Sequence, residues 1–188
     1  MSTVHVSDPQ VLRALAHPLR GRLLGLLRVD GPSTATRLAE RVGESSGLTS
    51  YHLRQLAQHG LVAEVEGHGT GRERWWRAEH QMTNWEPAEI VGQPGGLEAN
   101  EAMHRHQVEG WGRELSAWVG HGRQHGVAWA EVAGLSDYVL QLTPDETRQV
   151  LDEVYAVVDR WAETHREPRD GTTAVNLLVG AFPRTEAP

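Results

Sequence analysis

The sequence predicts a mainly α-helical fold of the α+β class, in which a small domain of helices and one hairpin precedes a longer helical region. Apolar residues recur at helical spacing in several segments, each bounded by a start or stop signal. A glycine-rich turn from Gly67 to Gly71 separates two short segments with strand character. Proline and glycine then punctuate residues 81–96, which predicts a linker between a domain at 9–80 and a second domain at 97–183.

Three helices are predicted in the first 43 residues. The first starts after Asp8, with Pro9 in its first turn. The second opens at Pro18 and ends at Gly31, and the third begins at Thr34, a residue suited to cap a helix. Their inward faces are apolar and carry Leu12, Leu15, Leu23, Leu27, Leu38 and Val42.

A fourth helix ends at Gly60, which is expected to adopt the left-handed conformation that closes a helix. Thr49, Leu53 and Leu56 recur at i, i+4 and i+7 and predict a buried side. The opposite side offers small, hydroxylated and cationic groups from Ser46, Gly47, Ser50, Tyr51 and Arg54. Such a helix suits insertion into the major groove of DNA, where base edges present hydrogen-bonding groups.

Strands are predicted at 61–66 and 72–78, on either side of the glycine-rich turn. Helices followed by this hairpin define a winged helix-turn-helix with an extra N-terminal helix. Arg72 and Arg74 share a face of the second strand and are expected to bind phosphate or the narrow minor groove rather than form structural ion pairs. For Arg54, contact with a guanine edge and contact with a phosphate both stay open.

Charge is divided unevenly along the chain. Residues 1–80 hold 10 arginines against 8 acidic residues, a net charge of +2, whereas residues 81–188 hold 8 arginines against 17 acidic residues, a net charge of −9. DNA is therefore expected to meet only the front part. The chain has no cysteine, no signal-peptide pattern and no apolar run near the ~20 residues that a bilayer requires, so a cytoplasmic protein without a membrane partner is expected.

A long amphipathic helix is predicted from residue 97 to about residue 121. Val108, Trp111, Leu115 and Trp118 repeat at i, i+3, i+7 and i+10 on one side of it. Large buried aromatic side chains dominate interfaces, so this seam is the predicted dimer interface. The alternative is a pocket for an aromatic ligand, lined by these tryptophans together with Trp129 and Trp161.

The last part of the chain has the pattern strand, helix, strand. The strands are expected at 136–142 and 173–182. The helix between them starts with Thr143 as N-cap, Pro144 at the first position and Glu146 at the third, the composition of a capping box. This order predicts a small two-stranded α+β unit with a right-handed crossover and parallel strands.

The front part of the chain resembles the ArsR-type winged-helix repressors over roughly residues 9–80. The runs that carry the resemblance are ALAHPLRGRLLGLL, TATRLAERVG, SSGLTSYHLRQLAQHGLV and GRERWWR. The resemblance implies a homodimer that binds an operator and releases it when an effector binds. By position, it places Ser46, Gly47, Ser50, Tyr51 and His52 in the DNA-reading part of the recognition helix.

The chain departs from the metal-sensing members of that family. Their arsenic sensors carry cysteines in the helix that corresponds to residues 34–42, and this chain has none. Their zinc sensors place Asp, His and Glu ligands on the helix after the wing, where this chain spaces its acidic residues and histidines differently. His121 and His125 lie at i, i+4, a spacing that can chelate zinc or nickel, but the glycines beside them disfavour a helix. No metal site and no cofactor is therefore assigned.

Together these patterns predict a transcriptional regulator, a homodimeric repressor that binds double-stranded DNA at an inverted repeat. Residues 97–183 are expected to dimerise, and the sequence leaves open whether a small-molecule effector binds there. One alternative is a winged-helix module that binds protein instead of DNA, and another is a metal-responsive repressor that uses C-terminal histidines. An enzyme is not expected, because the sequence has no nucleophile–base motif, phosphate loop or paired carboxylates.

Overall fold

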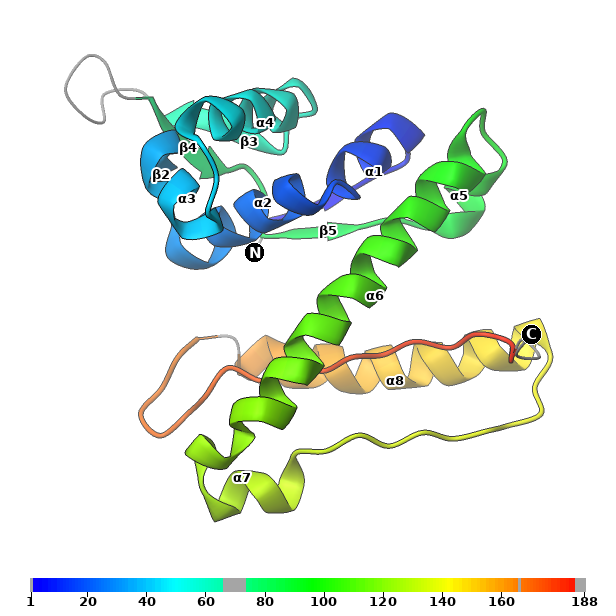
Figure 1. Ribbon diagram of the computed structural model, residues 1–188. Coiled ribbons are helices and arrows are strands. Elements are labelled where there is room, and N and C mark those ends of the chain that lie inside the picture. The colour runs from blue at the N-terminus through cyan, green and yellow to red at the C-terminus, as the bar shows by residue number, and fades with distance from the viewer. Residues whose placement is uncertain (1, 66–73, 166, 185–188) are drawn as a thin grey trace. The chain divides into compact units, whose positions relative to one another are not determined.

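The front part of the chain folds in the predicted order of helices and hairpin (Figure 1). The structure is a computed structural model that describes residues 2–65, 74–165 and 167–184. It divides into a first unit, Met1–Ala117, and a second unit, Trp118–Pro188, which are described separately. The helices before the hairpin are α1 (Pro9–Leu15), α2 (Pro18–Asp30), α3 (Ala35–Val42) and α4 (Ser46–Gln58).

Local caps fix where these helices begin and end. The side chain of Asp8 accepts a hydrogen bond from the backbone N–H of Gln10 at 2.7 Å and so starts α1. The hydroxyl of Thr34 accepts from the N–H of Arg37 at 3.3 Å, which confirms Thr34 as the N-cap of α3. Gly60 has a φ of +67°, the left-handed conformation predicted after α4.

The hairpin belongs to a three-stranded sheet. Strands β3 (Val62–Val65) and β4 (Trp75–Ala78) pair antiparallel, and β2 (Ser33–Thr34) pairs with the other edge of β4. The sequence did not predict β2, because a two-residue strand is too short for an alternating pattern. The wing tip at 66–73, with its glycines and Arg72, lies outside the described residues.

The core of the first unit consists of leucines from all the helices before the hairpin, closed by the sheet. α4 packs against α1, α2, α3 and β3, so it lies at the centre of this arrangement. The buried side chains include Leu12, Leu23, Leu38, Leu53, Leu56, Leu61 and Trp76.

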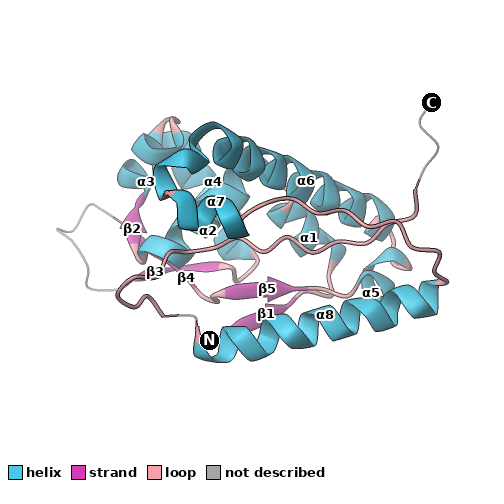
Figure 2. Cartoon of the chain, turned by 90° about the horizontal axis from the view of Figure 1, so that it is seen from below, coloured by secondary structure: helices cyan, strands magenta, loops and turns pink. Residues whose placement is uncertain are grey.

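Residues 81–96, expected as a linker, hold a strand and a helix. Strand β5 (Met82–Asn84) pairs parallel with β1 (Thr3–His5) at the N-terminus, and the two lie side by side in Figure 2. Helix α5 (Pro87–Val91) follows, and its Ile90 is fully buried in the core. Neither element was predicted from the sequence. For β5 the reason is that parallel pairing joins segments that are far apart in the chain.

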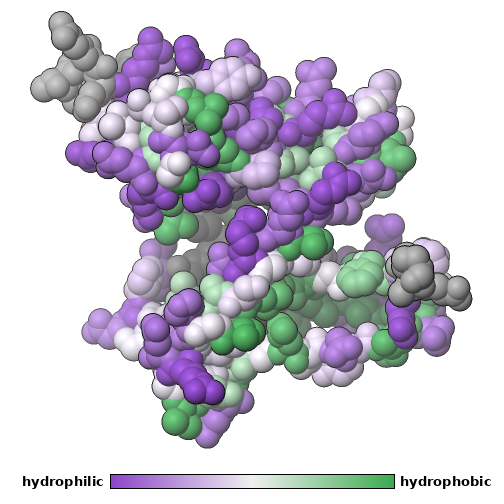
Figure 3. All heavy atoms as spheres, in the orientation of Figure 1, coloured by the Kyte–Doolittle hydropathy of each residue, from purple (hydrophilic) through white to green (hydrophobic). Residues whose placement is uncertain are grey.

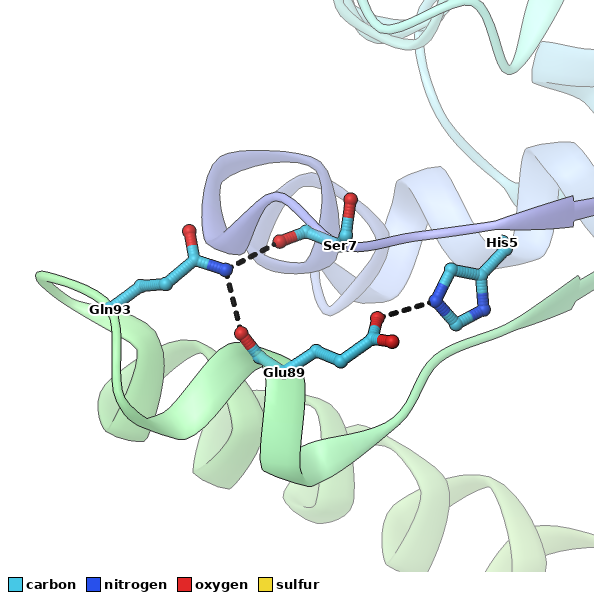
Figure 4. A network of polar contacts seen from close by, with 4 residues as sticks. All are labelled: His5, Ser7, Glu89 and Gln93. Atoms are coloured by element: carbon cyan, nitrogen blue, oxygen red, sulfur yellow. Dashed lines mark hydrogen bonds and ion pairs between the residues drawn. The ribbon is translucent and has the colours of Figure 1, made fainter.

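Polar contacts connect α5 to the N-terminal segment (Figure 4). Nε2 of His5 lies 2.6 Å from a carboxylate oxygen of Glu89. This hydrogen bond raises the pKa of His5 above its ordinary value. The side-chain amide of Gln93 donates to the backbone oxygens of Ser7 at 2.8 Å and Glu89 at 2.7 Å. The start of the chain is thereby bound to the segment that follows the wing.

The predicted long helix is confirmed as α6 (Gly96–His121). Its first turn lies against α5, where a Cβ on Gly96 would come within 1.8 Å of the backbone oxygen of Ile90. Only glycine fits this approach. Ala99 is fully buried one turn later, so α6 starts inside the core of the first unit.

The second unit contains a 3-10 helix, η1 (Gly122–His125), and two helices, α7 (Val127–Val132) and α8 (Pro144–Thr164), among its described residues. The capping box at the start of α8 is confirmed. The N–H of Thr143 donates to Glu146 at 2.8 Å, and the N–H of Glu146 donates to the hydroxyl of Thr143 at 3.2 Å. The bond from the N–H of Thr143, together with one from its hydroxyl group to the same carboxylate oxygen at 2.8 Å, lowers the pKa of Glu146. In the described part of the chain, no helix combines the length and apolar character needed to cross a membrane.

The predicted C-terminal strands are the main correction to the expected fold. Within the described residues, 136–142 and 173–182 are extended but belong to no sheet, so the expected crossover unit is absent from the single chain. An alternating apolar pattern specifies an extended backbone but not its partner, and a strand needs a neighbour to pair with. Figure 3 shows apolar residues at the surface of this unit.

Candidate nucleic-acid interface

Helix α4 presents one buried side and one open side, as its sequence pattern predicts. Thr49, Leu53 and Leu56 are fully buried. The hydroxyl of Ser45 accepts from the N–H of Leu48 at 3.2 Å and caps the first turn. The apolar side is thus fixed in the core, and the rotation of α4 about its own axis is determined.

The open side carries the predicted polar residues. Ser46, Gly47, Tyr51 and Arg54 are exposed, and Ser50 is partly buried. The Nε of Arg54 donates to the backbone oxygen of Ser50 at 3.2 Å, which uses one of the five N–H donors of the guanidinium group. The side chain of Arg54 is thereby held along the open side of α4.

A surface hollow of about 420 Å³ joins this side of α4 to the sheet and to the start of α3. Hydroxyl groups and guanidinium groups supply most of its polar lining, a composition suited to phosphate and to base edges. Helix α3 also begins there, and the first N–H groups of a helix attract anions. The lining residues are Thr34, Ala35, Thr36, Ser46, Ser50, Arg54, Arg74 and Trp76.

Arg74 enters this hollow from the base of the wing and is already paired. Its guanidinium group lies 2.7 Å from Glu64 on the neighbouring strand, with 67% and 46% of the two side chains exposed. Exposed pairs of this kind contribute only about 0–1 kcal/mol, so a phosphate can replace the carboxylate at small cost. This ion pair was not predicted for Arg74, because cross-strand register cannot be read from one strand.

Two further residues beside the hollow were missed from the sequence. Thr36 lines the hollow at the start of α3. Arg37 lies with its guanidinium carbon 5.1 Å from the ring centre of Trp75, within cation–π range. Arg37 occupies the N3 position of α3, where a capping box would place Glu. An arginine at this position was the feature of the sequence that could have indicated a role for a positive charge there.

His52 lies on the buried side of α4, apart from the other predicted residues. It is 7% exposed. Its ring centre lies 4.5 Å from that of His17 at the start of α2 and 5.1 Å from that of Tyr51, in an edge-on contact. His52 therefore supports Tyr51 and α4 from behind, while Tyr51 is about half exposed.

A third histidine lies beside α2. His106 on α6 packs against Gly21, where a Cβ would come within 2.5 Å of its Nε2. Burial lowers the pKa of His17, His52 and His106. The neighbouring Arg20 and the partner histidine lower the pKa of His52 further, and Glu44 opposes them.

The predicted seam on α6 lies away from the core. Val108 is exposed, and Trp111, Leu115 and Trp118 are partly exposed. At about 100° per residue, Val108 and Leu115 project opposite to Ala99 and His106, whereas Trp111 and Trp118 lie between these two sides of the helix. Among the described residues, no group of three or more His, Asp or Glu residues is placed to hold a metal ion.

Comparison with known proteins agrees with this geometry. A family model described as a helix-turn-helix domain matches residues 15–65, from the end of α1 to the end of β3. The chain is therefore a DNA-binding regulator of the winged helix-turn-helix class, and its resemblance to the ArsR type is confirmed. None of the curated proteins gives a match.

Solved structures match the chain over most of its length but with low identity and low TM-scores. A mutant of ZitR from Lactococcus lactis is 15% identical, with a TM-score of 0.35, over 78% of this chain and 83% of that chain. The adhesin competence repressor AdcR from Streptococcus pyogenes is 13% identical, with a TM-score of 0.32, over 77% and 81%. RV1404 from Mycobacterium tuberculosis is 13% identical, with a TM-score of 0.32, over 80% and 81%. With scores this low, the class of the chain rests on the domain match.

The histidines behind α4 generate a prediction about pH. In the folded state, the pKa of each of these histidines lies below the value of about 6.5 expected in the unfolded chain. At pH values between the two, the unfolded chain therefore binds more protons than the folded chain. The free energy of unfolding should therefore fall as the pH drops from about 7 towards 5.5. His52→Gln should make this fall shallower in urea unfolding followed by circular dichroism.

Two comparisons make the measurement specific. His104→Gln, which removes an imidazole from an exposed position on α6, is the control for the substitution itself. His5 contributes with the opposite sign, because its raised pKa makes the folded state bind protons more tightly, so His5→Gln should steepen the fall. A wild-type slope in His52→Gln would contradict the assignment of His52.

Proposed function

We propose that the chain is a homodimeric repressor that binds an inverted-repeat operator in double-stranded DNA. The observation that carries this proposal is the hollow that brings the open side of α4 together with Arg74 at the base of the wing. A helix end, a polar helix face and a strand arginine converge there.

In this proposal α4 enters the major groove. Ser46, Gly47, Ser50 and Tyr51 approach the backbone and base edges, and Arg54 reads a guanine through its O6 and N7. Space around Gly47 supports a close approach, because among the described residues nothing beyond its chain neighbours and the backbone of α4 itself lies within 4 Å of a Cβ built there. His52 acts indirectly, by supporting Tyr51 from the buried side.

The wing then binds the DNA backbone. Arg74 would exchange Glu64 for a phosphate, and Arg72 would add a second contact. The net charge of +2 over residues 1–80 supports a small number of phosphate contacts per subunit, and the acidic remainder of the chain would face away from the duplex.

Dimerisation is proposed along the seam of α6. Val108 and Leu115 project from the side of α6 opposite to its core contacts, with Trp111 and Trp118 beside them, so a second copy can reach them. Two recognition helices would then enter successive major grooves about 34–36 Å apart, which matches an inverted repeat. An effector would act by shifting the population between dimers that fit this spacing and dimers that do not.

Arg54→Ala tests the reading of bases. Loss of a bidentate contact to guanine should weaken binding to the selected operator by roughly 5- to 150-fold, or about 1–3 kcal/mol, and relax specificity at one position. The operator is obtained by selection from random DNA, and affinity is measured by fluorescence anisotropy. Arg105→Ala removes the same charge from exposed α6 and should bind like wild type. Equal affinities for both variants would reject Arg54 as a reader.

The ion pair at the base of the wing makes a second prediction. Arg74→Ala should weaken all DNA sequences similarly and reduce the slope of log affinity against log salt by about 1. Glu64→Gln should instead strengthen binding, because Arg74 no longer exchanges a carboxylate for a phosphate. If Glu64→Gln binds more weakly than wild type, the pair orders the wing for binding and the proposed exchange is wrong.

The dimer seam is tested by Trp111→Ala combined with Trp118→Ala. Loss of two large side chains from an interface should raise the dimer dissociation constant by at least about tenfold, which analytical ultracentrifugation measures as a lower dimer fraction. Arg113→Ala, on the opposite side of α6, is the control. An unchanged dimer in the double variant would place the interface elsewhere.

A further inference from the structure

The second unit exposes the side chains that would ordinarily form its core. None of its described residues is buried, although it holds Trp161, Tyr155 and several valines and leucines. Tyr138 and Phe182 are 85% and 84% exposed. Burial of apolar surface is the main driving force of folding, so a unit without a core requires another surface to cover it.

The exposed side chains lie on three separate elements. Val150, Val154, Val157 and Trp161 follow one side of α8 at helical spacing. In segment 136–142, Tyr138, Leu140 and Leu142 share one side of the extended chain, which is apolar, and the other side carries Asp137 and Gln141 with Val139 between them.

Segment 173–182 is apolar on both sides, with Val175, Leu177 and Val179 on one side and Leu178 and Phe182 on the other. Within the described part of the chain, both segments are extended without belonging to a sheet (Figure 1). Their seven and ten residues exceed the usual strand length of about 5–6. They thus have the length and apolar character of strands, and no sheet among the described residues includes them.

We infer that the missing partner is a second copy of this chain. Segments 136–142 and 173–182 of two copies pair to form one sheet, and the apolar stripes of both α8 helices pack on it. This inference rests on the proposed homodimer but assigns it a second interface, separate from the seam of α6.

Charge supports a second copy over a different protein. Residues 118–188 carry 11 acidic residues against 6 arginines, a net charge of −5, yet the two extended segments contain a single charged residue, Asp137. A matching partner must present uncharged, apolar strands, and this chain presents them itself. A two-fold axis places identical patches opposite each other, and the assembly closes at two copies when the same pair of chains shares this interface and the seam of α6.

The available area is also sufficient. About a dozen large apolar side chains on these three elements are partly or largely exposed, and full burial of such residues covers on the order of 100–200 Å² each. Burial of half of that area gives on the order of 1,000 Å² per copy, compared with about 800 Å² per partner in a stable interface. The single chain, by contrast, leaves this area in water.

Hydrogen–deuterium exchange of the full wild-type chain tests the inference without any substitution. Backbone N–H groups of 136–142 and 173–182 should be protected at high protein concentration and should lose protection as the dimer dissociates over a roughly hundredfold dilution. Protection that does not change with concentration would mean that the strands pair within one chain. Absence of protection at every concentration would mean that another molecule covers them. Either result overturns the inference.

Leu140→Asp and Gln141→Asp form a matched pair on adjacent residues. The first places a carboxylate on the apolar side and should raise the dimer dissociation constant by at least about tenfold, whereas the second adds the same charge to the polar side and should change it little. Equal effects would contradict the assignment. DNA binding is measured on the same samples to separate the two proposals. If the wild-type chain fails to bind DNA but shows concentration-dependent protection, the proposed function is rejected and the inferred interface stands.

Discussion

The burial of one side of α4 is the constraint on which the arrangement of the first unit depends. Thr49, Leu53 and Leu56 are fully buried where α4 meets α1, α2, α3 and β3. Each buried leucine contributes about 1.5–3 kcal/mol relative to an exposed one, so turning α4 about its axis would forfeit much of the core. The buried side therefore fixes the direction in which the open side of α4 faces, and this direction places the open side at the hollow beside the wing.

Signals that act over a few residues made most of the first unit predictable. A capping hydroxyl such as that of Thr34 or Thr143 acts within three residues, and a closing glycine such as Gly60 acts on the turn that it ends. Helical spacing identified both the buried and the open side of α4. The polar face of the candidate site could therefore be read from the sequence, because it is the complement of a buried face.

Contacts between distant segments could not be read in the same way. The parallel pair of β1 and β5 joins Thr3 to Met82, and no local pattern indicates that partner. The pair of Arg74 with Glu64 depends on cross-strand register, and the contact between His52 and His17 depends on how α4 meets α2. For 136–142 the pattern predicted an extended backbone correctly, but pairing is a property of two segments and was predicted wrongly for the single chain.

The position of α6 connects these features into one mechanical arrangement. Its start is buried against α5, and its His106 packs directly on Gly21 of α2. The start of α2 in turn carries His17, whose ring lies beside that of His52 on the buried side of α4. A shift of α6 would therefore press His106 against α2, and through His17 it would reach the support of α4. Because the proposed dimer seam lies on the same helix, a ligand that repacks this seam would act on these contacts as well as on the spacing between the two α4 helices of the proposed dimer.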